Sequence, residues 1–385
     1  MNYGIITIGS RGDIEPFIAL GKGLIKRGHH VRIAAFSIFK DDIESNGFEY
    51  SPLAGDAVEV MNLLIGQQIS SFEYFRNLEK LLNPIKKQFL SDIERACRGI
   101  DVLLYSLLGS VAWHVADKYG IPCFRVSFCP IDPTGEFPAM TAPIFPFGAP
   151  YNRLTFWIGD RLWSHATRKL LNDWRAEMGL PQIKPFRFPY RRLHGKEIPT
   201  LYAYSPVLSP KPHEYDHEKY VTGFWTEERR DSYEPDQKLA DFLSAGSKPI
   251  YIGFGSTVGG DFDQALSIVL GSLKRTDQRA VLSAGWGNLK GVDLPDTVMQ
   301  VGYVPHGWLF KQVSAVAHHG GAGTTGAGIR AGVPSIIIPF GGDQPYWGER
   351  VYKLGIGPKP ILRSKLNDDN FASAIYQATH DQRMI

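Results

Sequence analysis

Hydrophobic and polar positions follow one pattern twice along the chain: a short apolar run, a glycine-containing turn, then apolar positions at helical spacing. In the first repeat, the apolar run 3–8 precedes Phe17, Leu20 and Leu24, which follow a period of 3.6, and Gly28 ends that helix. The first half thus predicts strands at 3–8, 30–35, 102–105, 123–128 and 200–204 and helices at about 15–27 and 110–119.

The second half repeats the pattern after a charged run at 227–231. It predicts strands at 249–254, 280–283, 299–301, 313–317 and 335–339 and helices at about 262–275 and from the turn at 318–325 to about 331. This alternation indicates an α/β protein with parallel sheets covered by helices on both faces. We predict two Rossmann-like domains, at 1–220 and 237–385, joined by a linker at 221–236.

Between about 130 and 196 the pattern gives way to proline- and aromatic-rich sequence. Core packing explains many of these aromatic residues, and a wide apolar cleft for a substrate explains the prolines as well, so both interpretations stay open. The aromatic residues in question are Phe137, Phe145, Phe147, Tyr151, Phe156, Trp157, Trp163 and Trp174.

Composition narrows the class of protein. A hydrophobic share of 43% and a charged share of 21% exclude a disordered chain, and a net charge of +3 is too small to favour nucleic acid. The cysteines Cys97, Cys123 and Cys129 have no metal or disulfide spacing, which favours a reducing compartment. The first residues suit a core strand better than a signal peptide, and the longest apolar stretch, 102–116, is too short and too interrupted to cross a bilayer. We therefore expect a cytoplasmic protein.

The turn at 318–325, HHGGAGTT, follows a buried strand and begins a helix. Its glycines let the main chain approach an anion, and the first amides of a helix have no internal partner. We expect the diphosphate of a ligand here. The expected donors are His319, the amides of Gly321, Ala322 and Gly323, and the hydroxyls of Thr324 and Thr325.

Asp343 and Gln344 follow the next strand, at the sheet edge where ligands of open α/β sheets bind. Two polar groups at one strand end can bind adjacent hydroxyls of a sugar. A role only in the turn is the alternative. Together with the turn at 318–325, they predict a site for a sugar linked to a diphosphate.

Several sequence motifs resemble the donor-binding signature of family 1 glycosyltransferases, which have the GT-B fold. They are HHGGAGTT, AGVP, PFGGDQ, WGERV and LGIGP. These motifs are most similar to those of sterol 3-beta-glucosyltransferases and of bacterial glycopeptide and macrolide glycosyltransferases. IGFGST, GWGNL, VPHGWLF, YAYSPVLSPKP and VTGFW extend the resemblance over most of the chain, least at 55–100 and 140–195. The resemblance implies two Rossmann-like domains facing each other across a cleft, the first for the acceptor and the second for the nucleotide-sugar donor.

The resemblance also implies an activity: inverting transfer of a hexose, glucose from UDP-glucose, to a hydroxyl of an apolar acceptor such as a sterol, triterpenoid, polyketide or lipid. Asp13, in the first strand-to-helix turn, matches the position of the family's general base, while a helix cap is the alternative role for it. We expect Ser10 and Gly12 near the diphosphate. A nucleotide-sugar epimerase or a non-catalytic binder of a nucleotide-sugar or a lipid is the competing interpretation.

Further donor contacts follow from the same resemblance. Tyr303 and Val304 are expected against the base of the nucleotide, Ser256 as one more diphosphate donor, and Trp286 as a second wall or a core residue. His318, next to His319, is expected to pack or to fix the loop. The signature's ribose-binding glutamate is replaced by Ala327. This leaves open whether the nucleotide of the donor is UDP or TDP.

No metal and no cofactor are expected, since helix termini and neutral donors stabilise the leaving diphosphate. The sequence Asp261-Phe262-Asp263 favours a helix start over a metal site. The basic residues Arg187, Arg191, Arg192 and Lys196 favour a solvated face, with contact to an anionic membrane surface as the alternative. No obligate protein partner is implied. Relatives continue through a helix that crosses back to the first domain, whereas this chain ends at Ile385.

Overall fold

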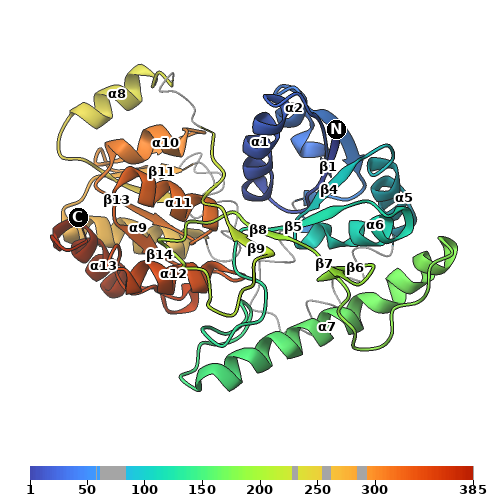
Figure 1. The fold of residues 1–385 in the computed structure, drawn as a ribbon. Coiled ribbons are helices and arrows are strands. Elements are labelled where there is room, and N and C mark those ends of the chain that lie inside the picture. Colours follow the sequence, from blue (N-terminus) through green and yellow to red (C-terminus); the bar gives the residue numbers. More distant parts are fainter. Residues whose placement is uncertain (58, 61–83, 228–232, 254–261, 284–292, 385) are drawn as a thin grey trace. The chain divides into compact units, whose positions relative to one another are not determined.

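The computed structural model describes residues 1–57, 59–60, 84–227, 233–253, 262–283 and 293–384 (Figure 1). These residues form two compact units. Unit 1 contains the described residues up to Glu227, and unit 2 contains those from 233 onward. The finer domain and linker bounds given above stay a prediction.

Unit 1 is built on a seven-stranded parallel sheet with the order β3-β2-β1-β4-β5-β8-β9. Its strands are β1 (Asn2–Ile6), β2 (His30–Phe36), β3 (Glu49–Leu53), β4 (Val102–Tyr105), β5 (Cys123–Ser127), β8 (Thr200–Tyr202) and β9 (Lys219–Val221). A separate antiparallel hairpin joins β6 (Arg192–Leu193) and β7 (Lys196–Glu197). In the order of the strands, β1 and β4 are the neighbours at which the direction of winding reverses.

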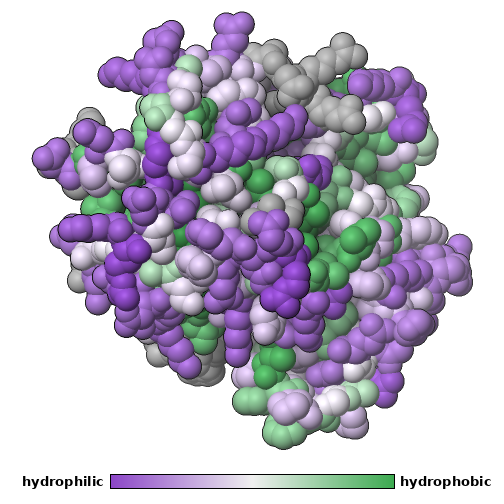
Figure 2. Space-filling view, turned by 90° about the vertical axis from the view of Figure 1, so that its left-hand side faces the viewer, coloured by the Kyte–Doolittle hydropathy of each residue, from purple (hydrophilic) through white to green (hydrophobic). Residues whose placement is uncertain are grey.

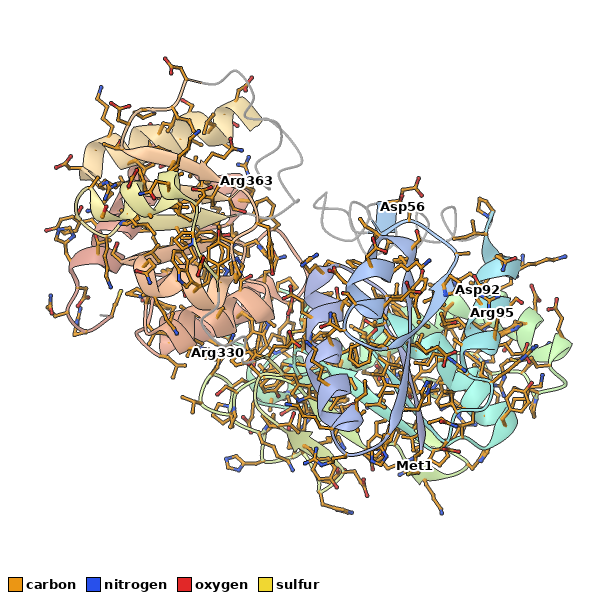
Figure 3. All side chains as sticks on the ribbon, turned by 90° about the horizontal axis from the view of Figure 1, so that it is seen from above. Met1, Asp56, Asp92, Arg95, Arg330 and Arg363 are labelled. Atoms are coloured by element: carbon orange, nitrogen blue, oxygen red, sulfur yellow. The ribbon has the colours of Figure 1, made fainter. Side chains whose placement is uncertain are left out.

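The helices of unit 1 follow the strands along the chain and include one of 30 residues, α7, which extends along the lower edge of Figure 1. The α-helices are α1 (Arg11–Ile25), α2 (Lys40–Glu44), α5 (Lys86–Ala96), α6 (Trp113–Tyr119) and α7 (Gly148–Glu177), with short 3-10 helices η1 (Ser37–Phe39) and η2 (Leu108–Ala112). Figure 3 shows the side chains of these elements, among them Asp92 and Arg95 of α5, which form an ion pair of 2.7 Å.

Unit 2 has a five-stranded parallel sheet with the equivalent order β12-β11-β10-β13-β14. Its strands are β10 (Ile250–Gly253), β11 (Ala280–Ser283), β12 (Val298–Val301), β13 (Ala315–His318) and β14 (Ser335–Ile337). Its helices are α8 (Gln237–Ser244), α9 (Phe262–Thr276), α10 (His306–Leu309), α11 (Ala322–Ala331), α12 (Gln344–Lys353) and α13 (Asp368–His380), with η4 (Phe310–Gln312) and η5 (Arg363–Lys365).

Alternate residues of the unit 2 strands point into two different cores. Ile250 and Ile252 of β10 pack with α9 and α13, whereas Tyr251 between them packs with α8, α10 and α11. Successive side chains of a strand point to opposite faces, so apolar residues at every position bury both faces of the sheet. The continuous apolar runs in the sequence follow from this arrangement, and the predicted α/β class with Rossmann-like units is confirmed.

Parallel strands of this order place their carboxyl ends, and the turns that follow them, at one edge of each sheet. In unit 1, the turn after β1 leads to Asp13 and the segment after the adjacent β4 leads to Ser106. In unit 2, the turn after β13 leads to His319, and β14 beside it leads to Asp343. The fold therefore brings the predicted site residues of each unit to the edge where such sheets bind ligands.

Three differences from the predicted elements matter for function. Helix α1 begins at Arg11 and not near 15, so Asp13 lies in its first turn. Strand β9 was not predicted. The region around 130–196, for which no helix was predicted, contains α7. No helix in the part of the chain that the structure describes is both long and apolar enough to cross a membrane.

On the face shown in Figure 2, hydrophilic residues predominate and hydrophobic residues appear in smaller groups.

Candidate active site

In unit 1, the main chain turns sharply between β1 and α1 and places the Asp13 carboxylate against the start of the helix. Asp13 Oδ2 accepts hydrogen bonds from the Ser10 amide at 2.7 Å and from the Ser10 hydroxyl at 3.1 Å. Gly9 adopts a positive φ of 148°, and a Cβ there would lie 2.2 Å from Asp13 Oδ2. Only glycine leaves room for the carboxylate in this turn. The capping role considered for Asp13 is therefore present, and it fixes the orientation of the carboxylate.

Burial raises the pKa of Asp13 to about 6, and the two hydrogen bonds from Ser10 lower it by less. Asp13 as a whole residue is half-buried. A carboxylate with this pKa is ionised at neutral pH and accepts a proton more readily than an ordinary aspartate. Of the other two residues predicted here, Ser10 is occupied with Asp13, and Gly12 is exposed in the first turn of α1.

In unit 2, two adjacent histidines at the end of β13 have different environments. His318 is fully buried, and its Nδ1 accepts a hydrogen bond of 3.0 Å from the Gly320 amide, which confirms the loop-fixing role. His319 is half-buried, and its Nε2 lies so close to Gly321 that a Cβ on that residue would be 2.6 Å away. The imidazole of His319 thus lies over the first residue of the turn into α11.

Burial lowers the pKa of His319 to about 4, so its imidazole is neutral at physiological pH and carries one N–H. Its Nδ1 is buried and has no hydrogen-bond partner among the described residues. A buried ring nitrogen without a partner is costly, and a bound ligand that shares a hydrogen bond with this ring would offset that cost.

The N-terminus of α11 provides main-chain donors. Its N-cap is Gly321, and no side chain caps the helix there. The first amides, those of Ala322, Gly323 and Thr324, therefore have no intrahelical acceptor. The Thr325 hydroxyl donates to the Gly321 carbonyl at 2.9 Å, so its proton is already used. Over the described residues, the half-buried Thr324 hydroxyl has no such partner, which makes it the better side-chain donor for an anion.

Asp343 and Gln344, at the start of α12, lie next to this turn. A Cβ on Gly320 would be 3.2 Å from the main-chain oxygen of Gln344. Gln344 Oε1 accepts hydrogen bonds from the amides of Phe340 and Gly341 at 2.7 and 3.2 Å, and Asp343 Oδ2 accepts one of 2.7 Å from the Trp347 indole. Each residue thus supports the turn with one of its polar atoms.

The segment predicted to contact the base has two contrasting residues. Tyr303 is 62% exposed, while Val304 is buried in one of the cores of unit 2. Ala327, in the place of the signature's glutamate, is also buried in that core. Val304 can therefore offer its main chain to a ligand, and Tyr303 its ring. Ser256 and Trp286 lie outside the described residues.

His306, which was not predicted as a site residue, lies near His319. Its ring interacts electrostatically with His319, and burial lowers its pKa to about 4. It stacks on Phe310 with 4.4 Å between ring centroids and lies 3.2 Å from the Tyr251 hydroxyl. The sequence signal for a role of His306 was its position directly after Tyr303-Val304-Pro305, where α10 begins. A second neutral imidazole therefore lies at the same sheet edge as His319.

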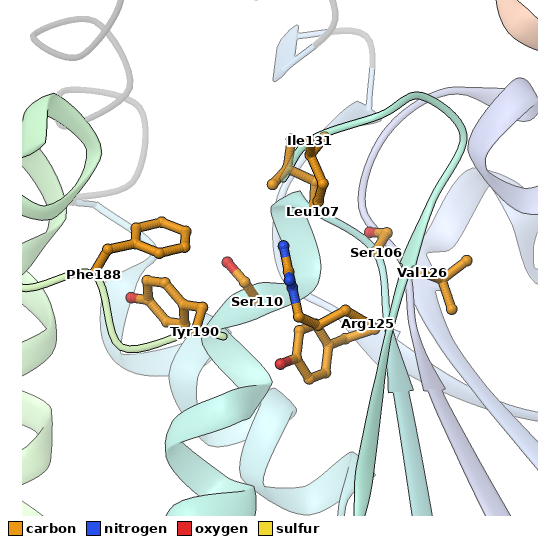
Figure 4. Close-up of a pocket in the computed structure, with 9 residues that line it drawn as sticks. Ser106, Leu107, Ser110, Arg125, Val126, Ile131, Phe188 and Tyr190 are labelled. Carbon is orange, nitrogen blue, oxygen red and sulfur yellow. The ribbon is translucent and has the colours of Figure 1, made fainter. Parts of the chain in front are cut away.

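Unit 1 also contains a pocket at the carboxyl ends of β4 and β5 (Figure 4). Its walls are mainly apolar, with hydroxyl groups and one guanidinium among them. The lining residues are Tyr105, Ser106, Leu107, Ser110, Arg125, Val126, Ile131, Phe188 and Tyr190. The Tyr105 hydroxyl is buried without a hydrogen-bond partner in the described structure. Since β4 pairs with β1, the pocket and Asp13 follow neighbouring strands of one sheet.

The aromatic residues of the 130–196 region do not gather at this pocket. Phe156 and Trp174 are buried on α7, and Phe145, Phe147 and Trp157 are exposed on the surface. Among the basic residues noted at 187–196, Arg191 is not part of a solvated face. It forms ion pairs with Asp132 at 3.0 Å and Asp160 at 2.6 Å. Core packing, one of the two interpretations left open for this region, thus holds for Phe156 and Trp174, and the region contributes Ile131, Phe188 and Tyr190 to the pocket.

Within the described residues, no group of three or more histidine, cysteine, aspartate or glutamate side chains gathers as metal ligands. Asp263 lies in the first turn of α9, in agreement with the helix start favoured for that motif, and Asp261 is outside the described residues. Cys97 and Cys123 are buried free thiols, and Cys129 is half-buried.

Two protein-family models match the chain, one in each half. The glycosyltransferase family 28 N-terminal domain matches residues 3–138. The C-terminal domain of erythromycin biosynthesis protein CIII-like proteins matches residues 267–384. Each match covers the part of the chain that contains one of the two sheet edges described above.

Curated relatives match over the whole chain. The chain is 38% identical over 400 residues to a sterol 3-beta-glucosyltransferase of Yarrowia lipolytica. The match covers 100% of this chain and 27% of that protein. The chain is 36% identical over 403 residues to a sterol 3-beta-glucosyltransferase of Neurospora crassa. This match covers 100% of this chain and 25% of that protein. The chain thus spans about a quarter of the length of these relatives.

Solved structures share the fold. The glycotransferase of kitacinnamycin superposes with a TM-score of 0.72 and 20% identity, covering 100% of this chain and 91% of that chain. The glycosyltransferase VinC, solved in complex with DTDP, superposes with a TM-score of 0.63 and 19% identity. The superposition covers 100% of this chain and 92% of the VinC chain.

Proposed function

Since the chain belongs to the GT-B glycosyltransferases that include the sterol 3-beta-glucosyltransferases, we propose that it transfers a hexose from a nucleotide diphosphate to a hydroxyl of an apolar acceptor. The observation that carries this proposal is the N-terminus of α11, where uncapped amides and a neutral, half-buried His319 converge on one turn. Unit 2 supplies the donor site in this scheme, and unit 1 supplies the base and the acceptor pocket.

The proposed donor is UDP-glucose. The diphosphate binds at the amides of Ala322, Gly323 and Thr324 with the Thr324 hydroxyl and His319 beside them. These donors stabilise the charge that grows on the leaving diphosphate. The sugar hydroxyls bind Asp343 and Gln344, and the base of the nucleotide stacks on Tyr303. The structural relative VinC with DTDP and the name of the sterol glucosyltransferases support a nucleotide diphosphate and glucose, respectively.

The proposed chemistry is a single displacement with inversion. The Asp13 carboxylate takes the proton of the acceptor hydroxyl. The acceptor oxygen forms a bond to the anomeric carbon, while the bond from that carbon to the diphosphate oxygen breaks and its electron pair leaves with UDP. A base with a pKa of about 6 suits this step, because it is ionised near neutral pH and still binds the proton well.

The acceptor proposed here is an apolar alcohol such as a sterol. The unit 1 pocket has a free volume of about 10 Å³, which admits one small group and not a ring system, so we place only the hydroxyl end of the acceptor near it. Its walls include the apolar residues Leu107, Val126 and Ile131. Ser106 and Ser110 offer hydroxyls to a polar group of the ligand. The pocket follows β4, the neighbour of the strand that leads to Asp13.

Glucose transfer to a sterol, followed by mass spectrometry, tests the proposal directly. Asp13→Asn keeps the shape of the side chain and is expected to lower kcat by on the order of 10²-fold or more, with little change in UDP affinity. His319→Ala is expected to weaken UDP binding and kcat together. A fully active Asp13→Asn enzyme would remove Asp13 as the base.

The outcomes also separate this function from its competitors. UDP binding without transfer or donor hydrolysis would indicate a binding protein, and a change of the sugar's stereochemistry on the intact donor would indicate an epimerase. We further propose that transfer needs no metal, so activity is expected to persist in EDTA. Loss of activity in EDTA that Mg²⁺ restores would contradict this.

A further inference from the structure

Helix α7 has a buried side of mixed polar and apolar residues and, in its first half, an exposed side that is apolar. Asn152, Thr155 and Phe156 are buried against unit 1. Leu154, Trp157, Ile158 and Leu162 are spaced at i, i+3, i+4 and i+8 and are all exposed. Residues at this spacing share one side of a helix, so α7 presents an apolar stripe to its surroundings.

The segment before α7 extends this stripe with aromatic residues. Phe147 is 66% exposed and Phe145 is also exposed, and their rings lie 5.5 Å apart. Tyr151 of α7 contacts both rings. We call Phe145, Phe147, Leu154, Trp157, Ile158 and Leu162 the α7 apolar face.

Hydrogen bonds hold this segment in place. The Tyr151 hydroxyl donates to the Pro143 carbonyl at 2.7 Å, and the Ala139 amide donates to the Thr155 hydroxyl at 2.8 Å. Asn152 Nδ2 donates to the Gly135 carbonyl at 2.8 Å. The exposed aromatic residues are therefore presented by an anchored element. An ordered apolar surface of this kind typically marks a binding site for another surface.

The surroundings of the α7 apolar face are basic. Residues 141–169 contain four cationic side chains and one acidic one. The acidic residue, Asp160, pairs with Arg191, and one of the four cations, Arg153, pairs with Glu214. Arg161 lies over the Trp157 ring, 3.4 Å from its centroid, and Lys169 is exposed one helix turn beyond His165. The neighbouring Phe186 is exposed, stacks with His165, and is flanked by the exposed Lys184 and Arg187.

Apolar and aromatic side chains bordered by arginine and lysine are the chemistry that binds anionic membrane surfaces, with rings in the interface and cations at the headgroups. We propose that the α7 apolar face docks on a lipid membrane that carries anionic headgroups. The cationic rim opposes a second copy of the same face as the partner, because two such rims would repel each other.

Vesicle binding tests this without any use of transfer activity, so the result is independent of the function proposed above. The probe is vesicles of phosphatidylcholine and phosphatidylserine in equal amounts, with pure phosphatidylcholine for comparison. The double variant Leu154→Ser/Ile158→Ser changes two exposed residues and is expected to lower binding to the mixed vesicles about tenfold or more. Val207→Ser, at an apolar residue outside the face that is even more exposed, is the control and should bind as the unchanged chain does.

Two further readouts make the assignment specific. Brominated lipid should quench tryptophan fluorescence in the unchanged chain and much less in Trp157→Phe, since Phe keeps the binding but removes the reporter. Arg161→Gln/Lys169→Gln should weaken binding only to the mixed vesicles. Absence of vesicle binding, equal binding by the double variant and its control, or equal affinity for pure phosphatidylcholine would overturn the proposal. So would a dimer in solution that the double variant dissociates, which would assign the face to a second copy.

Discussion

At the residue scale, the ionisation of Asp13 depends on two opposing effects. Burial favours the neutral carboxylic acid, while the amide and hydroxyl of Ser10 favour the carboxylate. Burial dominates, so the pKa rises from 3.8 to about 6. A base of this kind works only above its pKa, and the Ser10 hydroxyl is the part of its environment that a substitution can remove.

We predict an acidic limb near pH 6 in the pH profile of kcat/KM, and we predict that Ser10→Ala moves it to higher pH. Removing the hydroxyl deletes one hydrogen bond to the carboxylate and keeps the one from the Ser10 amide. The pKa of Asp13 should therefore rise further. The rise should be smaller than the loss of both hydrogen bonds would cause, because the bond from the Ser10 amide remains. Rates measured between pH 5 and 9 check this. An unchanged or lower limb in Ser10→Ala would contradict the assignment.

The same shift predicts a pH dependence of stability. The folded chain binds the Asp13 proton more tightly than the unfolded chain does, so this group stabilises the fold below pH 3.8 and loses that contribution as pH rises through about 6. Asp13→Asn lacks this proton. The free energy of unfolding of the unchanged chain, relative to that of the variant, should fall across this window in urea titrations. A rise would show that the carboxylate is favoured by folding.

At the turn before α11, Gly321 is the residue that leaves room for His319. We predict that Gly321→Ala weakens UDP binding by about tenfold or more without unfolding unit 2, because the new Cβ would lie 2.6 Å from Nε2 and displace the imidazole. Isothermal titration with UDP measures this. Gly307→Ala is the matched control, since its Cβ meets no atom within 4 Å. Equal affinity in both variants would mean that His319 is not part of the donor site.

At the element scale, α1 holds Asp13 only if the rest of the helix packs on unit 1. Two of its glycines differ in their surroundings. A Cβ on Gly21 would lie 2.6 Å from the Phe48 ring, whereas one on Gly23 meets no atom within 4 Å. The close approach of α1 to Phe48 therefore requires glycine at one position and leaves the other free.

We predict that Gly21→Ala destabilises unit 1 by about 1–3 kcal/mol, because Phe48 is buried and must move. Gly23→Ala should be neutral or stabilise by up to about 1 kcal/mol, since alanine is the better helix former. Urea unfolding of the two variants side by side measures the difference. A similar loss in both would show that helix propensity, and not contact with Phe48, decides the outcome.

The elements that could be predicted from the sequence are those with one clear period. The prediction of a strand at 280–283 is confirmed by β11, and α9 and α11 end within one residue of the expected positions. Helix α7 was missed because apolar residues occur on both of its faces, which hides the helical period, and because prolines precede it. The start of α1 was misplaced because the Ser10 cap lies inside a glycine-containing turn.

Roles of single residues were harder to predict than elements. The sequence placed Thr325 among the donors, yet its hydroxyl closes a bond with Gly321 in its own helix. It placed Arg191 in a basic cluster, yet two carboxylates from distant segments hold it. Such contacts depend on which segments meet in space. For the same reason, the pocket after β4 and the proximity of His306 to His319 could not be inferred from spacing.

At the scale of the whole molecule, each unit has its own core and its own part of the proposed chemistry. Unit 2 has two apolar clusters on the two faces of its sheet. Unit 1 depends on a buried polar group as well. Asp132 accepts hydrogen bonds from Arg125 at 2.8 Å and from the Tyr202 hydroxyl at 2.6 Å, and all three residues are buried.

We predict that Asp132→Ala destabilises unit 1 by about 3–5 kcal/mol, because it leaves the buried Arg125 without its carboxylate. UDP binding should persist at urea concentrations where unit 1 has unfolded, since the donor site belongs to unit 2. Far-ultraviolet circular dichroism and UDP titration on the full chain, at a series of urea concentrations, check both statements. Loss of UDP binding together with unit 1 would show that the donor site needs both units.

The segment 186–190 connects the two surfaces of unit 1 that the proposals assign to lipid and to acceptor. Phe186 stacks on α7 beside the apolar face, and Phe188, two residues later, lines the pocket. For an enzyme held at a bilayer by α7, a sterol dissolved in the leaflet approaches by lateral diffusion. Turnover should then scale with the mole fraction of sterol in the membrane, and diluting the sterol with inert lipid should slow the reaction even when the total amount of sterol is constant.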